Sequence, residues 1–127
     1  MGAPTGRIGV RPDADDSAAR VLRVDPRDGA AGVYRDAPVV IRLSHPADPE
    51  SLSSETVFVQ DPEGSLPGSL ERSPDGQVVI WRGQRPFVPG VLHFVVASGL
   101  RDRRGRGVPK HVSRFVPCDL ARDDVFL

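Results

Sequence analysis

Apolar and polar side chains alternate along short stretches of this chain, with the period of two that extended strands require. In APVVIRLS, the side chains of Val39, Ile41 and Leu43 fall on one side of such a strand. The same period in QVVIWRG places Val79 and Trp81 together on one side. We expect these five side chains to face a buried core.

Seven stretches of this kind follow one another, each bounded by turn residues: ARVLRVDP, APVVIRLS, TVFVQ, LPGSLERS, QVVIWRG, VLHFVVAS and VSRFVP. DPEG and SPDG between them predict two hairpins. Pro46 and Pro49 remove strand hydrogen bonds, so we expect HPADPESLSS to cross to a second sheet in a short helical turn. Seven short strands predict an all-β immunoglobulin-like β-sandwich in two sheets, although a small barrel has a similar pattern.

The apolar alternation also suggests where the domain begins and ends. Residues 1–18 contain Gly, Pro and acidic residues without apolar periodicity, which predicts a flexible leader or linker. Residues 19–117 hold all seven strands and form the expected domain. Residues 118–127 form a C-terminal tail with an apolar end, Val-Phe-Leu.

Composition and charge narrow the classes of partner. The 17 basic and 17 acidic residues cancel, so no long-range field attracts nucleic acid or an anionic membrane. The chain starts without the apolar core of a signal peptide, and no apolar run is long enough to insert into a membrane. Cys118 is the only cysteine, so the fold is expected to hold without an internal disulfide.

The residues that most often carry catalysis do not form a recognisable set. The three histidines lie in different segments without metal-ligand spacing, which predicts no metal site. We expect His93 to be a packed ring with one nitrogen bonded to the backbone. Ser44 and His45 precede Asp48, but neighbours on a strand point to opposite faces, which argues against a triad. The sequence predicts no catalytic residue and no cofactor.

Acidic clusters at residues 13–16, 25–28 and 121–124 offer the oxygen ligands that calcium prefers. Their spacing is not that of an EF-hand, so the simpler interpretation is solvated carboxylates in turns and tail.

A basic cluster lies in the loop GLRDRRGRG, where each guanidinium could contact phosphate or an acidic glycan. It comprises Arg101, Arg103, Arg104 and Arg106. No aromatic residue interleaves with these arginines, and the simpler interpretation is a solvated loop.

The turn residues have structural roles of their own. Asp28 and Gly29, in DPRDG, supply the side-chain hydrogen bond and positive φ that a reversal needs. Asp102 is expected to accept backbone N–H bonds within its loop, which turns at Gly105.

The outward positions of the strands form an apolar face, which we regard as a candidate binding surface: Val40, Phe58, Ile80, Phe94 and Val96. Apolar clusters exposed to water usually mark an interface, or a part of the chain covers them. The leader or the tail, residues 118–127, is the alternative that would cover this face.

Two separated blocks resemble the bacterial Ig-like domain of S-layer and other large surface proteins, called the SbsA-type Ig-like domain. The first block comprises Pro26, Asp28, Gly29, Ala30, Val33, Val39, Ile41, Leu43, Ser44, Pro46, Asp48 and Pro49. The second block comprises Pro86, Phe87, Gly90, Gly99, Leu100, Asp102 and Gly105. The resemblance spans roughly residues 20–117.

The resemblance implies a noncatalytic module of a bacterial envelope or secreted protein, serving as a spacer or protein–protein interaction domain. Its partners would be another protein or the neighbouring domains of a larger surface protein, and self-association is possible. A glycan- or cell-wall-binding module, with or without calcium, is the alternative, and a hydrolytic or metal-dependent enzyme is disfavoured. An odd number of reversing strands would send the chain in at one pole and out at the other, as a spacer requires.

Overall fold

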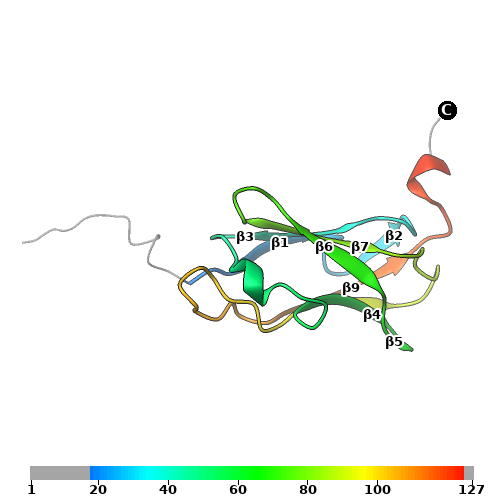
Figure 1. The fold of residues 1–127 in the computed structure, drawn as a ribbon. Helices are drawn as coiled ribbons and strands as arrows, with labels where there is room; N and C mark the ends of the chain where they lie inside the picture. The colour runs from blue at the N-terminus through cyan, green and yellow to red at the C-terminus, as the bar shows by residue number, and fades with distance from the viewer. Residues whose placement is uncertain (1–17, 125–127) are drawn as a thin grey trace, which may run out of the picture.

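Two β-sheets pack face to face in the computed structural model, which describes residues 18–124 (Figure 1). Sheet A has the strand order β1-β3-β7-β6, with β1 Val21–Asp25, β3 Val39–Leu43, β7 Val78–Gly83 and β6 Gly68–Arg72. Sheet B has the order β2-β9-β8-β4-β5, with β2 Ala30–Val33, β9 His111–Pro117, β8 His93–Ala97, β4 Val57–Asp61 and β5 Gly64–Ser65. The predicted all-β sandwich is confirmed.

Two of these strands were not predicted. β2 follows a turn after β1 and joins the opposite sheet, where it pairs in parallel with β9. β5 has two residues and pairs with β4 through the predicted DPEG hairpin. The SPDG hairpin between β6 and β7 also forms, and the crossing after β3 contains the short helix η3 (Pro49–Ser51). A second short helix, η4, spans Arg122–Asp124.

The core lies between the sheets and contains the side chains that alternation placed inward. Val39, Ile41, Leu43 and Val79 are fully buried, and Trp81 is 3% exposed. This confirms the register predicted for β3 and β7.

An aromatic cluster extends the core towards sheet B. Phe87 packs edge-on against His93 and Phe115, with ring centroids 5.1 Å apart in each pair. The His93 ring is buried, and its Nδ1 lies 2.7 Å from the carbonyl oxygen of Val91. The expected packed histidine with one backbone hydrogen bond is therefore present.

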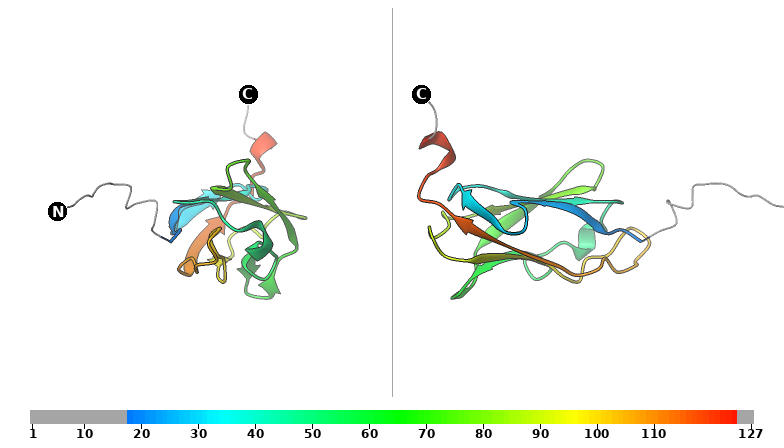
Figure 2. Two further views of the ribbon diagram at one scale, coloured as in Figure 1. Left: turned by 60° about the vertical axis from the view of Figure 1, so that its left-hand side comes forward. Right: turned by 180° about the vertical axis from the view of Figure 1, so that it is seen from behind.

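The described chain enters the sandwich at one pole and leaves it at the other (Figure 2). At the N-terminal pole, Ala19 donates its N–H to Asp102 in the loop 101–107. At the C-terminal pole, β9 ends at Pro117. The predicted pole-to-pole path is present, although β2 runs parallel to β9 and strands do not simply reverse one after another.

The predicted leader, apart from Ala18, lies outside the described residues, as do the last three residues of the tail. Within the part of the chain that the structure describes, no helix has the length and apolar character that crossing a membrane requires.

Candidate functional site

The loop 101–107 at the N-terminal pole is closed by its own backbone. Asp102 donates its N–H to the carbonyl of Arg106 at 2.9 Å, and Gly105 donates to the carbonyl of Asp102 at 2.9 Å. Gly105 has a φ of +81°, which a residue with a side chain rarely adopts. The expected turn at Asp102 and Gly105 is therefore present.

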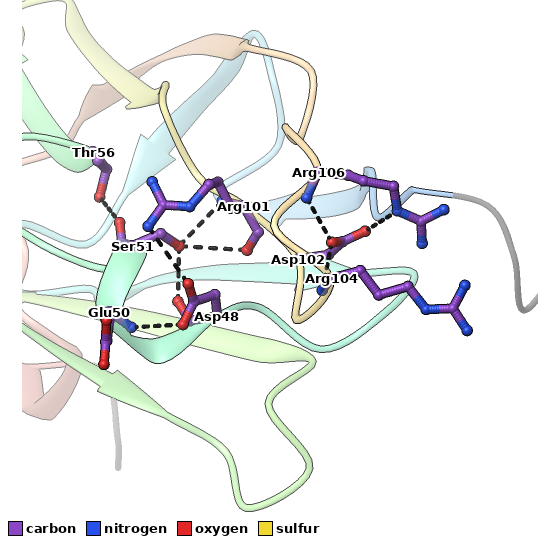
Figure 3. Close-up of polar contacts among 8 residues, drawn as sticks. All are labelled: Asp48, Glu50, Ser51, Thr56, Arg101, Asp102, Arg104 and Arg106. Carbon is purple, nitrogen blue, oxygen red and sulfur yellow. Dashed lines mark hydrogen bonds and ion pairs between the residues drawn. The ribbon is translucent and has the colours of Figure 1, made fainter.

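Asp102 is 3% exposed, and its carboxylate lies inside this loop (Figure 3). Its Oδ1 accepts the N–H groups of Arg104 at 2.9 Å and Arg106 at 3.0 Å. Its Oδ2 accepts Nε of Arg106 at 3.0 Å and the N–H of Ala19 at 3.4 Å. Burial alone would raise the pKa of Asp102, but these backbone bonds and the Arg106 charge together hold it below the usual value. The group remains an anion and organises the loop.

A second hydrogen-bond network connects the turn at η3, where the chain crosses between the sheets, to the same loop (Figure 3). Ser51 donates its hydroxyl to the carbonyl of Asp48 at 2.7 Å and accepts the N–H of Arg101 at 3.1 Å. The Arg101 guanidinium lies 3.5 Å from the Asp48 carboxylate. Sequence reasoning did not single out Ser51; the available signal was Asp48 before Pro49, which is typical of a helix N-cap.

The basic cluster divides between the ion pair with Asp48 and a hollow beside the loop. Arg101 pairs with Asp48, whereas the other three arginines of the cluster border a hollow of about 170 Å³. The residues that line this hollow are His45, Pro46, Asp102, Arg103, Arg104 and Arg106. We call it the arginine hollow. It brings together residues that are about sixty positions apart in the sequence.

Ser44 and His45 lie side by side, so the expectation that their side chains point to opposite faces is wrong. The chain bends after Leu43, where β3 ends, so the two side chains are not on opposite faces of a strand. Ser44 Oγ lies 2.9 Å from Nδ1 of His45 and also accepts the N–H of Arg20 at 2.9 Å. The carboxylate of Asp48 instead accepts the N–H of Glu50 and pairs with Arg101. Ser44 and His45 thus meet, with Asp48 engaged elsewhere.

The candidate apolar face is divided between the two sheets, so its prediction as one face was wrong. Phe58, Phe94 and Val96 lie on β4 and β8 of sheet B, whereas Val40 and Ile80 pair across β3 and β7 of sheet A. Alternation shows which side chains point outward but not which sheet carries a strand.

On sheet A, Val40 and Ile80 are half-buried neighbours within a charged row. Asp25 is the strand partner of Val40, and Glu71 is the strand partner of Ile80. This pair is therefore an isolated apolar spot between two carboxylates.

On sheet B, the apolar side chains are continuous across three strands. Phe58, Val96 and Val112 occupy one cross-strand row, and Phe94 occupies the next outward position along β8. With Gln60 and Lys110 they line a hollow of about 280 Å³. We call Phe58, Phe94, Val96 and Val112 the sheet-B face. Val112, which is 48% exposed, was missed, although it alternates with the inward Ser113 and Phe115.

The described part of the tail lies elsewhere. Cys118 donates its N–H to the carbonyl of Val33 at 2.7 Å, and Arg35 donates to the carbonyl of Leu120 at 2.9 Å. Arg122 donates to the Asp36 carboxylate at 2.9 Å. Residues 118–124 therefore pack on the chain after β2 and do not cover the sheet-B face.

The other turn named from the sequence is tied to β9. Gly29 has a φ of +84° and donates its N–H to the carbonyl of Arg114 at 2.8 Å. Asp28 accepts the N–H of Arg114 at 2.9 Å. The expected side-chain bond and positive φ are both present, and they position β2 beside β9.

Of the acidic clusters considered for calcium, the one at residues 25–28 is engaged with arginines. Asp25 lies 3.2 Å from Nε of Arg23, and Asp28 lies 3.7 Å from Nε of Arg114. Within residues 18–124, no group of three or more His, Cys, Asp and Glu side chains has an arrangement that could hold a metal ion. The cluster at residues 13–16 lies outside the described residues.

No protein-family profile and no curated protein matches the chain. Several solved structures do match it. An N-terminal part of the bacterial S-layer protein SbsC matches 82% of this chain at 18% identity, with a TM-score of 0.63. An L,D-transpeptidase from Mycobacterium tuberculosis H37Rv matches 78% of this chain and 40% of its own length at 22% identity, with a TM-score of 0.53. CopC from Methylosinus trichosporium OB3b matches 79% of this chain and 93% of its own length at 10% identity, with a TM-score of 0.65.

These likenesses establish the fold. The described sandwich is shared with a module of a bacterial S-layer protein and with part of an L,D-transpeptidase. The chain spans only 14 to 24% of the length of the S-layer chains that it matches. The same sandwich therefore occurs as one part of much longer chains.

Proposed function

We propose that this chain is a noncatalytic Ig-like module of the SbsA type from a bacterial envelope or extracellular protein, and that it acts as a spacer. The path of the chain carries this proposal: it enters at the N-terminal pole and leaves at the C-terminal pole (Figure 2). Modules connected in this way extend a protein in one direction. The likeness to S-layer modules supports the same role.

The strand arrangement suits a module under tension. β1 begins at the N-terminal pole beside the end of β3, and β9 ends at the C-terminal pole between β2 and β8. Tension on the two ends therefore acts along the terminal strands. Hydrogen bonds loaded in this way resist together, whereas bonds at the end of a hairpin open one after another.

Single-molecule stretching of the intact chain between its two ends tests the spacer role. We expect one force peak followed by an extension of roughly 300 Å, because about 100 residues of up to about 3.5 Å each are released from a folded domain. Ala31→Pro removes a donor from β2 beside β9 and should lower the force without changing the extension. Ala31→Ser keeps the N–H and serves as the control. Extension without a force peak would contradict the spacer role.

We also propose that the sheet-B face is the surface through which the module contacts another protein. Its centre is apolar, and Gln60, Lys110 and Arg114 are the polar residues beside it. An apolar centre with a polar rim is typical of protein interfaces. Val40 and Ile80 form only an isolated apolar pair on sheet A, so they are not part of this surface.

A further inference from the structure

Arg72, which does not line the arginine hollow, lies beside it and adds positive charge to that of the loop 101–107. A Cβ added at Gly76 would lie 2.8 Å from Nη1 of Arg72 and 3.3 Å from Nη2 of Arg103. It would also lie 3.1 Å from Cβ of Pro46, which lines the hollow. Guanidinium groups from the end of β6 and from the loop 101–107 therefore come close together over Gly76, which is buried.

The carboxylate of Asp102 does not neutralise these two arginines. Its two oxygens already accept hydrogen bonds from three backbone N–H groups and from Nε of Arg106. This accounts for the roughly four lone-pair positions of a carboxylate. Across residues 18–124, the guanidinium groups of Arg72 and Arg103 have no ion-pair or hydrogen-bond partner. Two exposed like charges therefore lie close together without an ion-pair partner.

We propose that the arginine hollow is a binding site for an oxyanion, of which phosphate is the best match. The planar donor forks of Arg72 and Arg103 can each direct two N–H groups at one anion. An anion between them would relieve their repulsion. The side chain of His45 and the fork of Arg104 border the same space.

Two sources could supply the oxyanion. One is a phosphate group from solution or on another molecule. The other is the acidic cluster at residues 13–16, which lies outside the described residues. Both sources present anionic oxygens to the two arginines.

Titration of the intact chain with sodium phosphate, followed by amide NMR at constant ionic strength, tests the site. We expect saturable shifts of the Gly76, Arg103 and Gly105 signals. Arg72→Gln combined with Arg103→Gln should weaken binding at least about tenfold, since one charge-assisted hydrogen bond corresponds to that ratio or more. Arg27→Gln, an exposed arginine beside the turn at Gly29, is the matched control and should leave the affinity unchanged.

A variant with Asp13→Asn, Asp15→Asn and Asp16→Asn distinguishes the two sources. Saturation of the unmodified chain by phosphate identifies an external oxyanion. Saturation of this variant alone identifies the carboxylates of residues 13–16 as the natural occupant, and the site stands. Shifts that fail to saturate in both chains would overturn the proposal, as would equal affinity in the chain that lacks both arginine charges. The stretching experiment does not depend on either result, so the spacer role and the oxyanion site fail separately.

Discussion

Replacing Gly68 with alanine should strain the core, because a Cβ at this position would overlap the Trp81 ring. The added atom would lie 2.5 Å from Cζ2 and 2.6 Å from Nε1 of the indole. Carbon atoms in ordinary contact are about 3.5 to 4.0 Å apart, so one group must move by roughly 1 Å. Trp81 is 3% exposed and stacks on Phe87 with ring centroids 6.0 Å apart, which leaves the indole little room.

The expected loss of stability follows from this overlap. Overpacking a close-packed core costs about 1 to 3 kcal/mol. For a domain of this size, each kcal/mol lowers the midpoint of thermal unfolding by about 4 to 8 °C. We therefore expect Gly68→Ala to lower the midpoint by roughly 5 to 20 °C. Trp81 is the only tryptophan, so its fluorescence follows unfolding and also reports any displacement of the ring in the folded state.

Gly107→Ala is the matched control. A Cβ at Gly107 would have no atom within 4 Å, and the residue does not have a positive φ. We expect its midpoint to stay within about 3 °C of the unmodified chain, consistent with a surface change of less than about 0.5 kcal/mol. If Gly68→Ala unfolds at the same temperature and with the same emission as the control, the close approach of β6 to Trp81 is refuted.

Two further predictions concern the poles. Because the pKa of Asp102 is lower in the folded than in the unfolded chain, its stabilising effect is present above about pH 4 and is lost as the pH falls further. Asp102→Asn should therefore lower the urea midpoint at pH 7, with a difference that shrinks towards pH 3; an equal difference at both pH values would show that the charge is not responsible. A chain ending at Pro117 should have the same association state by light scattering as the intact chain, because residues 118–124 pack after β2. Association on truncation would instead show that the tail covers the sheet-B face.

The strands that alternation predicts are those with one face in the core. Val39, Ile41 and Leu43 recur every second residue, and this local pattern was sufficient to assign their burial. β2 has no such pattern: Ala31 and Gly32 are exposed, and the strand exists because Asp28 and Gly29 hold it against β9. Pairing of that kind depends on residues far apart in the sequence, so the pattern of neighbouring residues does not predict it.

The candidate surfaces show the same limit. Phe94 and Ile80 were both correctly placed as outward residues of their strands. The sequence around each strand does not indicate, however, that β8 and β7 belong to different sheets. The cluster in the loop 101–107 was visible as a run of arginines. Its meeting with Arg72 was not, because the two segments come together only when the turn at Gly76 packs beside Pro46.

The pairing of β2 with β9 sets a condition on how the module is made. Ala30 lies opposite Phe115, so most of the domain must be synthesised before β2 finds its place. At about 5 to 20 residues per second, that wait on the ribosome is roughly 4 to 17 s. Until β9 arrives, the edge of β8 that it will occupy has open hydrogen-bonding groups, which can pair with strands of another chain. In a chain built from several such modules, this interval is when neighbouring domains are at greatest risk of exchanging strands.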